Sequence, residues 1–204
     1  MINIIKSWED YIEKNLLELL GDKPEGNLYS RHLTKNKENA MIPKQINIIK
    51  FLKTFQPKNI LEIGFNAGFS TLLIKKTNPE IKITSIDINE HPYVLPCYKK
   101  ISQDYKDIKL ILENSLTALP KLILSNLSFD AIHIDGDHSI KTAEKDFIYC
   151  LKLSKKNSVI IVDDTNLNHI NQLCDYYIQK EIVKEFKFEK ENCNKYQHRF
   201  LEVL

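Results

Sequence analysis

The most informative segment of this chain reads Leu61-Glu62-Ile63-Gly64-Phe65-Asn66-Ala67-Gly68-Phe69-Ser70. It begins inside a short apolar run, residues 59–63, that is typical of a buried strand, and it ends where helical spacing starts. The two glycines between strand and helix are informative because the whole chain contains only five. Each is expected to stand where a side chain would not fit. The segment therefore predicts a strand, a tight turn and a helix.

The same alternation of strand and helix continues toward the C-terminus. Further apolar runs of strand length follow, with helix-compatible segments between them. We expect strands at 81–86, 108–112, 131–134 and 159–162, and helices at 69–76, 92–103, 116–125 and 140–154. This alternation is typical of a parallel sheet with helices on both faces.

The two ends of the chain predict additions to this sheet. Residues 3–20 and 42–55 place apolar side chains on one helix face, and the polar, turn-rich residues 22–40 between them resemble a lid. After a helix near 168–180, residues 182–188 and 199–204 read as strands that should pair antiparallel, because no helix fits between them. We expect one α/β domain with a seven-stranded, mostly parallel sheet. It spans residues 1–204, with 1–40 as a helical extension and loop and 41–204 as the catalytic core.

Composition and charge exclude several classes of protein. The chain has 204 residues, of which 43% are hydrophobic and 27% charged, as in ordinary globular domains. Its apolar runs are far shorter than the ~20 residues that span a bilayer, so we expect no membrane association. Lys and Arg (29) barely exceed Asp and Glu (27) and are scattered, which argues against a nucleic-acid partner. Four widely spaced cysteines and a charged N-terminus predict reduced thiols and a cytoplasmic location.

Polar residues follow the end of every predicted parallel strand. Ligands bind beyond the carboxyl ends of strands in an open parallel sheet, so these are candidate binding groups. In chain order they are Gly64 to Gly68, Asp87, Glu113-Asn114-Ser115, Asp135-Gly136-Asp137-His138 and Asp163-Asp164. Their convergence on one edge predicts a site for a nucleoside and a cation.

The first turn indicates which nucleoside is bound. Asp87 ends the second strand 23 residues after Gly64, the spacing of an acid that binds a ribose diol. The turn is not G-x-G-x-x-G, however, and Glu62 and Phe65 are an unusual lining for a pyrophosphate. A carboxylate suits a ligand that carries a cationic amine, which favours S-adenosylmethionine (SAM) over NAD.

These residues resemble a known family. Leu61 to Ser70 is similar to the first motif of class I SAM-dependent methyltransferases, and closest to the catechol O-methyltransferase-like branch with its E-x-G-x-x-x-G-x-S pattern. The stretches 129–139 and 159–164 resemble the metal-dependent sugar and small-molecule O-methyltransferases of that branch. The resemblance covers about residues 40 to 165. It implies a Rossmann-like class I methyltransferase fold and methyl transfer to a hydroxyl of a small molecule.

The resemblance also implies cofactor-binding roles. Glu62 would meet the methionine amino group, directly or through water, and Ser70 would lie near the methionine part. Asp87 would hold the ribose hydroxyls and Ile88 would lie beside the adenine. The full set implied to bind the cofactor is Glu62, Gly64, Gly68, Ser70, Asp87, Ile88, Asn114, Ser115 and Asp135, with Ala40 and Met41 as looser candidates.

A cluster of carboxylates predicts a metal. Asp135, Asp163 and Asp164 end adjacent strands, and like charges so close together raise one another's pKa or destabilise the fold. A divalent cation removes this repulsion, and oxygen ligands suit magnesium, calcium or manganese better than zinc, with magnesium the one expected. The alternative is that one aspartate caps a helix while the others face solvent.

Two residues are candidates for the base that deprotonates the acceptor. His138 has the natural pKa for the role and follows Asp135 by three residues, where related enzymes often keep a basic group. Asp137 is the rival, either as the base or hydrogen-bonded to a metal-bound water. His133 is expected to face elsewhere from its strand and to be packed.

Other functions stay open at this point. The first is a metal-independent methyltransferase, acting on a small molecule or on nitrogen. A non-catalytic nucleotide-binding module and an NAD-dependent dehydrogenase follow. The sequence does not identify the acceptor, and the apolar first helix allows a homo-oligomer.

Overall fold

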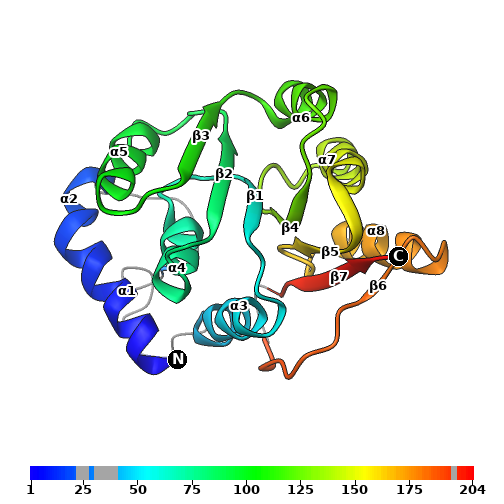
Figure 1. Cartoon of the computed structure of the whole chain (residues 1–204), viewed down its shortest axis with the longest axis horizontal. Coiled ribbons are helices and arrows are strands. Elements are labelled where there is room, and N and C mark those ends of the chain that lie inside the picture. The colour runs from blue at the N-terminus through cyan, green and yellow to red at the C-terminus, as the bar shows by residue number, and fades with distance from the viewer. Residues whose placement is uncertain (22–27, 30–40, 194–196) are drawn as a thin grey trace.

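The computed structural model describes residues 1–21, 28–29, 41–193 and 197–204. Its centre is a seven-stranded sheet in the order β3-β2-β1-β4-β5-β7-β6 (Figure 1). The strands are β1 (Asn59–Ile63), β2 (Lys82–Asp87), β3 (Ile108–Leu112), β4 (Phe129–Ile134), β5 (Ser154–Val162), β6 (Val183–Glu185) and β7 (Arg199–Val203). The first five strands pair in parallel, whereas β7 pairs antiparallel with both β5 and β6. The predicted mostly parallel sheet with an antiparallel C-terminal hairpin is confirmed.

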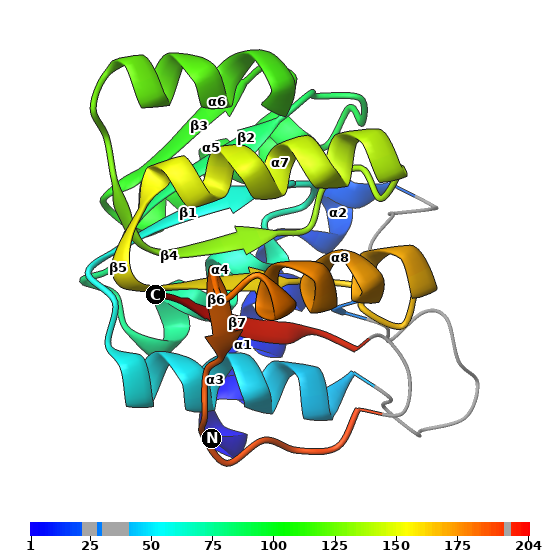
Figure 2. The ribbon, with the colours of Figure 1, turned by 90° about the vertical axis from the view of Figure 1, so that its right-hand side faces the viewer.

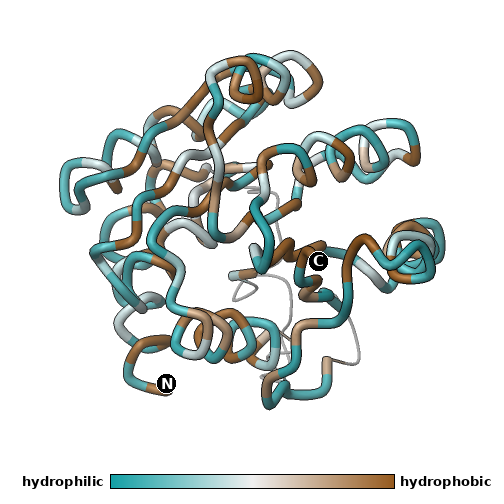
Figure 3. Tube along the Cα trace, turned by 45° about the vertical axis from the view of Figure 1, so that its right-hand side comes forward, coloured by the Kyte–Doolittle hydropathy of each residue, from teal (hydrophilic) through white to brown (hydrophobic). Residues whose placement is uncertain are grey.

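Helices cover both faces of the sheet, each over its own apolar core. One face is covered by α1 (Ile2–Asn15), α3 (Ile42–Phe55), α4 (Phe69–Thr77) and α5 (Val94–Asp104). The other is covered by α6 (Ser115–Leu124), α7 (Ile140–Leu153) and α8 (Asn168–Gln179), which lie together on one side in Figure 2. The helices alternate between hydrophobic and hydrophilic residues along the chain (Figure 3), as expected for helices with one buried face.

The N-terminal extension is part of the core. The helix predicted over 3–20 breaks at Leu16 into α1 and the short α2 (Leu17–Leu20). Trp8 of α1 is fully buried, and its indole N–H donates a 2.9 Å hydrogen bond to the carbonyl of Phe69 at the start of α4. The Trp8 and Phe69 rings meet edge to face at 6.3 Å between centroids. The extension therefore supports the helix that follows the glycine turn.

Some boundaries differ from the sequence prediction. β5 begins at Ser154, five residues before the apolar run at 159, and its pairing with β4 is irregular between Phe129 and Ala131. β6 ends at Glu185, three residues earlier than predicted, because Phe186 and Phe188 turn to pack against Phe51 of α3. Most of the expected 22–40 lid, including Ala40, lies outside the described residues. No helix in the described part of the chain is long and apolar enough to cross a membrane, and the four cysteines are free and buried.

Candidate active site

The glycine turn after β1 is shaped by close backbone contact. Gly64 has φ +94°, and its amide donates a 2.9 Å hydrogen bond to the carbonyl of Ile86 in β2. A Cβ at Gly64 would lie 2.1 Å from the backbone oxygen of Asp135, a distance that no side chain tolerates. Gly68 has φ +75° and stands at the N-cap of α4 against the ring of Phe65. Both glycines are required because the turn packs against β2, β4 and its own aromatic residue.

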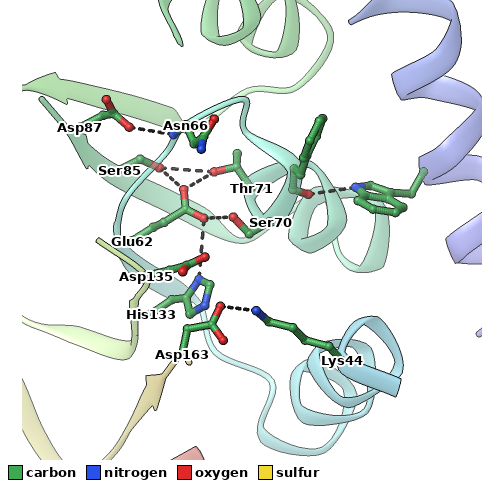
Figure 4. Close-up of polar contacts among 12 residues, drawn as sticks. Lys44, Glu62, Asn66, Ser70, Thr71, Ser85, Asp87, His133, Asp135 and Asp163 are labelled. Atoms are coloured by element: carbon green, nitrogen blue, oxygen red, sulfur yellow. Dashed lines mark hydrogen bonds and ion pairs between the residues drawn. The ribbon is translucent and has the colours of Figure 1, made fainter. Parts of the chain in front are cut away.

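Glu62 is the centre of a buried hydrogen-bond network (Figure 4). Its carboxylate has no solvent exposure and accepts hydrogen bonds from the hydroxyls of Ser70 (2.5 Å), Thr71 (2.5 Å) and Ser85 (2.7 Å). Nδ1 of His133 lies 3.9 Å from the same carboxylate. Since hydroxyls of α4 and β2 occupy both oxygens of Glu62, this residue joins β1, β2 and α4 beneath the turn. Ser70, and not Glu62, reaches the cavity above.

A cavity of about 450 Å³ lies above the ends of β1, β2 and β3. Asp87 and Ile88 line one side of it and Asn114 and Ser115 another, as the resemblance implies. Asp87 has its two oxygens fixed by the backbone amides of Asn66 and Asn89, each at 2.7 Å. Asn114 caps α6 by accepting a hydrogen bond from the amide of Leu116. Ile88 is 57% exposed, so it can cover a flat ligand without being part of the core.

A second cavity, of about 260 Å³, adjoins the first. The two share Gly64, Asn66, Asp135 and Gly136. The second cavity has an apolar part formed by Leu28, Ile48, Phe65, Ala67 and Phe69. Its polar part consists of Lys44, Ser70, His133, His138, Asp163 and Asp164.

The carboxylate cluster differs from the predicted one in a single member. The backbone ladder continues through the amides of Asp135 and Asp163, which bond to Ile63 and Ile134, so the two aspartates stand side by side. Each offers an oxygen within 4.8 Å of the other and of a ring nitrogen of His133. Asp164 is not in this group. The expectation that His133 faces elsewhere is wrong, because residues 133 and 135 alternate to the same side of β4.

Lys44 is the residue of this cluster that the sequence motifs did not include. It lies in the first turn of α3, only 2% exposed, and its ammonium donates a hydrogen bond to Oδ2 of Asp163 (Figure 4). The amide of Asp164 donates to the other oxygen, Oδ1, at 2.7 Å. One signal was present in the sequence: Lys44 shares the buried stripe of α3 with Ile48 and Phe51.

The residues of the cluster differ in how readily each carries its charge. Burial opposes ionisation of Asp163, but the neighbouring Lys44 outweighs it, and the pKa of Asp163 is lowered. Burial and the nearby Asp163 carboxylate raise the pKa of Asp135 well above its usual range. Burial opposes the charge on Lys44 too, and the surrounding aspartates nevertheless raise its pKa. The stable arrangement is therefore an ionised Lys44–Asp163 pair beside a carboxyl that retains its proton readily.

The two candidate bases have different surroundings. His138 lines the second cavity, and its Nε2 lies 3.9 Å from Oδ1 of Asp135 and 3.7 Å from Oδ2 of Asp164. Asp137 points toward the start of α7, where it accepts hydrogen bonds from the amide (3.0 Å) and hydroxyl (2.7 Å) of Ser139. These bonds lower the pKa of Asp137. Asp137 borders only the first cavity, so the geometry favours His138 as the base.

Solved structures of methyltransferases share this fold. An O-methyltransferase from Bacillus cereus, solved in complex with SAH, superposes with a TM-score of 0.67 at 16% identity over 98% of this chain and 90% of that one. A putative caffeoyl-CoA O-methyltransferase from Staphylococcus aureus gives 0.65 at 16% identity, over 97% and 91%. The O-methyltransferase TomG from Streptomyces achromogenes, in complex with SAM, gives 0.64 at 16% identity, over 98% and 88%. No curated protein sequence matches the chain.

A family model extends this likeness to the sequence. The model described as a methyltransferase domain matches residues 61–165, which is 105 of the 204 residues and runs from the glycine turn through the carboxylate cluster. The match covers both cavities apart from the residues that α3 and the N-terminal part contribute. This chain belongs to the methyltransferase-domain family.

Proposed function

We propose that the protein is a SAM-dependent O-methyltransferase that acts on a hydroxyl of a small molecule. The observation that carries the proposal is the pair of adjoining cavities that share Gly64, Asn66, Asp135 and Gly136. One is lined by the ribose-type acid Asp87, and the other contains a histidine and a lysine that can handle an acceptor hydroxyl. The structural neighbours described with SAH or SAM and named O-methyltransferases support the same function.

In this proposal residues of both cavities would hold the cofactor. Asp87 would bind the ribose, and Ile88 and Ser115 would contact the adenine, in the 450 Å³ cavity. Gly64 and Ser70 would contact the methionine part. Glu62 would act on it through the hydroxyl of Ser70, because Glu62 itself is fully buried beneath the turn and does not line the cavity.

Methyl transfer requires the acceptor oxygen to stand in line behind the methyl carbon. A phenolic hydroxyl has a pKa of about 10 and is little ionised at neutral pH, so a base is needed. His138 takes the proton of the hydroxyl while the oxygen forms its bond to the methyl carbon. The bond between carbon and the sulfonium sulfur breaks, and its electron pair stays on sulfur to leave the neutral thioether. Asp164, with Oδ2 at 3.7 Å from Nε2, then stabilises the protonated histidine.

The cavity favours a phenolic acceptor over a sugar. Leu28, Ile48 and Phe69 form an apolar part that suits an aromatic ring. A sugar would place further hydroxyls against these side chains, where each lost hydrogen bond to water costs binding energy. The partner proposed is therefore a small molecule and not a nucleic acid, in a reducing compartment such as the cytoplasm that suits the four free thiols.

The predicted divalent cation does not fit the residues as they are arranged. A metal bound by His133, Asp135 and Asp163 would have to share Asp163 with the Lys44 ammonium, which is hydrogen-bonded to Oδ2 of that carboxylate. The Lys44 ammonium would also repel a cation at that oxygen. The proposed reaction therefore uses no metal. The metal-independent methyltransferase, which the sequence left open, is favoured by this one observation.

Two measurements test the function. Calorimetry with SAH and with NADH should show binding of SAH alone, and binding of NADH alone would contradict the proposal. Transfer of a labelled methyl group from SAM should occur to phenolic acceptors such as catechol and should exceed transfer to hexoses. Labelling of amines but not hydroxyls under the same conditions would overturn the assignment to oxygen.

A further inference from the structure

We propose that Lys44 is the resident cation of the carboxylate cluster and excludes a divalent metal from it. For its effect on catalysis this inference rests on the proposed methyl transfer, but the exclusion of metal can be tested without it. Three carboxyl groups, those of Asp135, Asp163 and Asp164, lie near the Lys44 ammonium, and Asp163 is the one hydrogen-bonded to it.

The position of Lys44 is fixed from both ends of its side chain. Its backbone lies in α3, whose buried face packs into the core through Ile48, Ile49 and Phe51. Its ammonium is hydrogen-bonded to Asp163, which is 1% exposed at the end of a central strand. A buried ammonium is very costly without a carboxylate beside it, so the contact with Asp163 holds Lys44 at the cluster.

The same geometry limits the ligands left for a metal. With Asp163 paired to the Lys44 ammonium, the remaining members are Asp135 and His133. The imidazole of His133 also lies 3.9 Å from Glu62 through Nδ1, so it already faces an anion of the buried network. Two ligands beside a fixed ammonium make a poor site for a divalent cation, which needs several oxygens and no competing charge.

The ammonium also faces the reaction. Lys44 lines the second cavity together with His138 and Asp164. A fixed positive charge there stabilises the negative charge that develops on the acceptor oxygen as His138 removes its proton. Lys44 keeps all its protons during methyl transfer and contributes only its charge and a hydrogen bond.

Binding of manganese tests this assignment directly. Free Mn²⁺ is measured by electron paramagnetic resonance in titrations of the purified protein and of Lys44→Met. We expect wild type to bind Mn²⁺ only weakly, and Lys44→Met to bind at least about tenfold more tightly, because Asp163 is released. Lys44→Arg keeps the charge and should behave as wild type. Lys50→Met removes a lysine of the same helix that pairs with Glu191 outside the cluster, and should also leave binding unchanged.

Each result decides the question. Micromolar Mn²⁺ binding by the wild type would overturn the proposal, and so would equal affinities for wild type and Lys44→Met. If Lys44→Met does not fold, Lys44→Gln provides the second variant, with the same direction of change expected. SAH binding is measured on the same samples. If the wild type does not bind SAH, the proposed function is refuted, whereas the conclusion about metal binding is unaffected.

Discussion

Lys44 donates a hydrogen bond to Asp163 across 119 residues of sequence, and the two side chains are only 2% and 1% exposed. The pair joins α3 to the end of β5 at the site where the acceptor is proposed to bind. A buried ion pair is weak evidence of stability in itself, but removing one partner leaves an unpaired charge in the interior.

The ion pair should therefore show strong coupling in unfolding experiments. Asp163→Asn is expected to lower the free energy of unfolding by about 3–5 kcal/mol, since it removes the carboxylate to which the buried Lys44 ammonium is hydrogen-bonded. The double variant Lys44→Met/Asp163→Asn should cost clearly less than the sum of the single variants. Urea unfolding measures all three. Additive losses would show that the two residues do not interact in solution.

Replacement of Gly64 should disrupt the turn. Gly64→Ala forces a Cβ to within 2.1 Å of the Asp135 carbonyl at a positive φ, so we expect a loss of more than about 3 kcal/mol in stability and no measurable SAH binding. Gly21→Ala is the matched control, because Gly21 also has a positive φ (+68°) but no atom of the described residues lies within 4 Å of the added Cβ. It should cost about 1–3 kcal/mol, from backbone strain alone. Comparable losses for the two variants would refute the close approach.

Asp146 should make stability depend on pH. It is fully buried in α7, and burial raises its pKa from 3.8 to about 6, against the opposing effect of the Ser115 hydroxyl. The folded chain thus holds this proton more tightly than the unfolded chain, so its stabilising contribution is present below about pH 4 and is lost as pH rises through 6. The difference corresponds to about 3 kcal/mol.

The comparison with Asp146→Asn isolates this contribution. Between pH 4 and pH 7 the free energy of unfolding of the wild type should fall by about 3 kcal/mol relative to that of Asp146→Asn, because only the wild type has this proton to lose. Asp10→Asn, at an exposed position of α1, serves as the control and should follow the wild type. Parallel curves for wild type and Asp146→Asn would show that the buried carboxyl is not proton-linked to folding.

His138 and Asp137 should differ in their effect on the reaction. His138→Gln removes the base that faces the second cavity and should lower kcat for catechol methylation by about 10²- to 10⁴-fold, with SAH affinity little changed. Asp137→Asn alters a residue that binds Ser139, and should change kcat by no more than a few-fold. The reverse order of effects would assign the base to Asp137.

The sequence predicted the fold well because its signals are local. β1, β3 and α3 begin and end at the predicted residues, since apolar runs and helical spacing are read within one element. The requirement for glycine at position 64 follows from the rarity of glycine in this chain. β6 was predicted too long because Phe186 and Phe188 lie beyond the strand and pack against Phe51 of α3, which spacing alone does not distinguish from a longer strand.

The site was predicted less completely for a different physical reason. Asp135 and Asp163 could be placed together because neighbouring parallel strands end at the same edge. Lys44 lies in a helix that precedes all these strands, and its contact with Asp163 depends on how α3 packs. His133 stands two residues before Asp135, and this spacing is a sequence signal that places both side chains on the same side of the strand. The positive φ of Asp164 and its separation from the cluster had no signal in the sequence.

A crystal structure of the complex with SAH, grown in manganese chloride, tests the central claim most directly. We predict adenosine above Gly64 between Asp87 and Ser115, the sulfur directed toward His138, and the Lys44 ammonium on Asp163 with no anomalous manganese peak between Asp135 and Asp163. A manganese ion bridging these two aspartates, with Lys44 displaced, would contradict the account, as would a nucleoside bound away from the Gly64 turn.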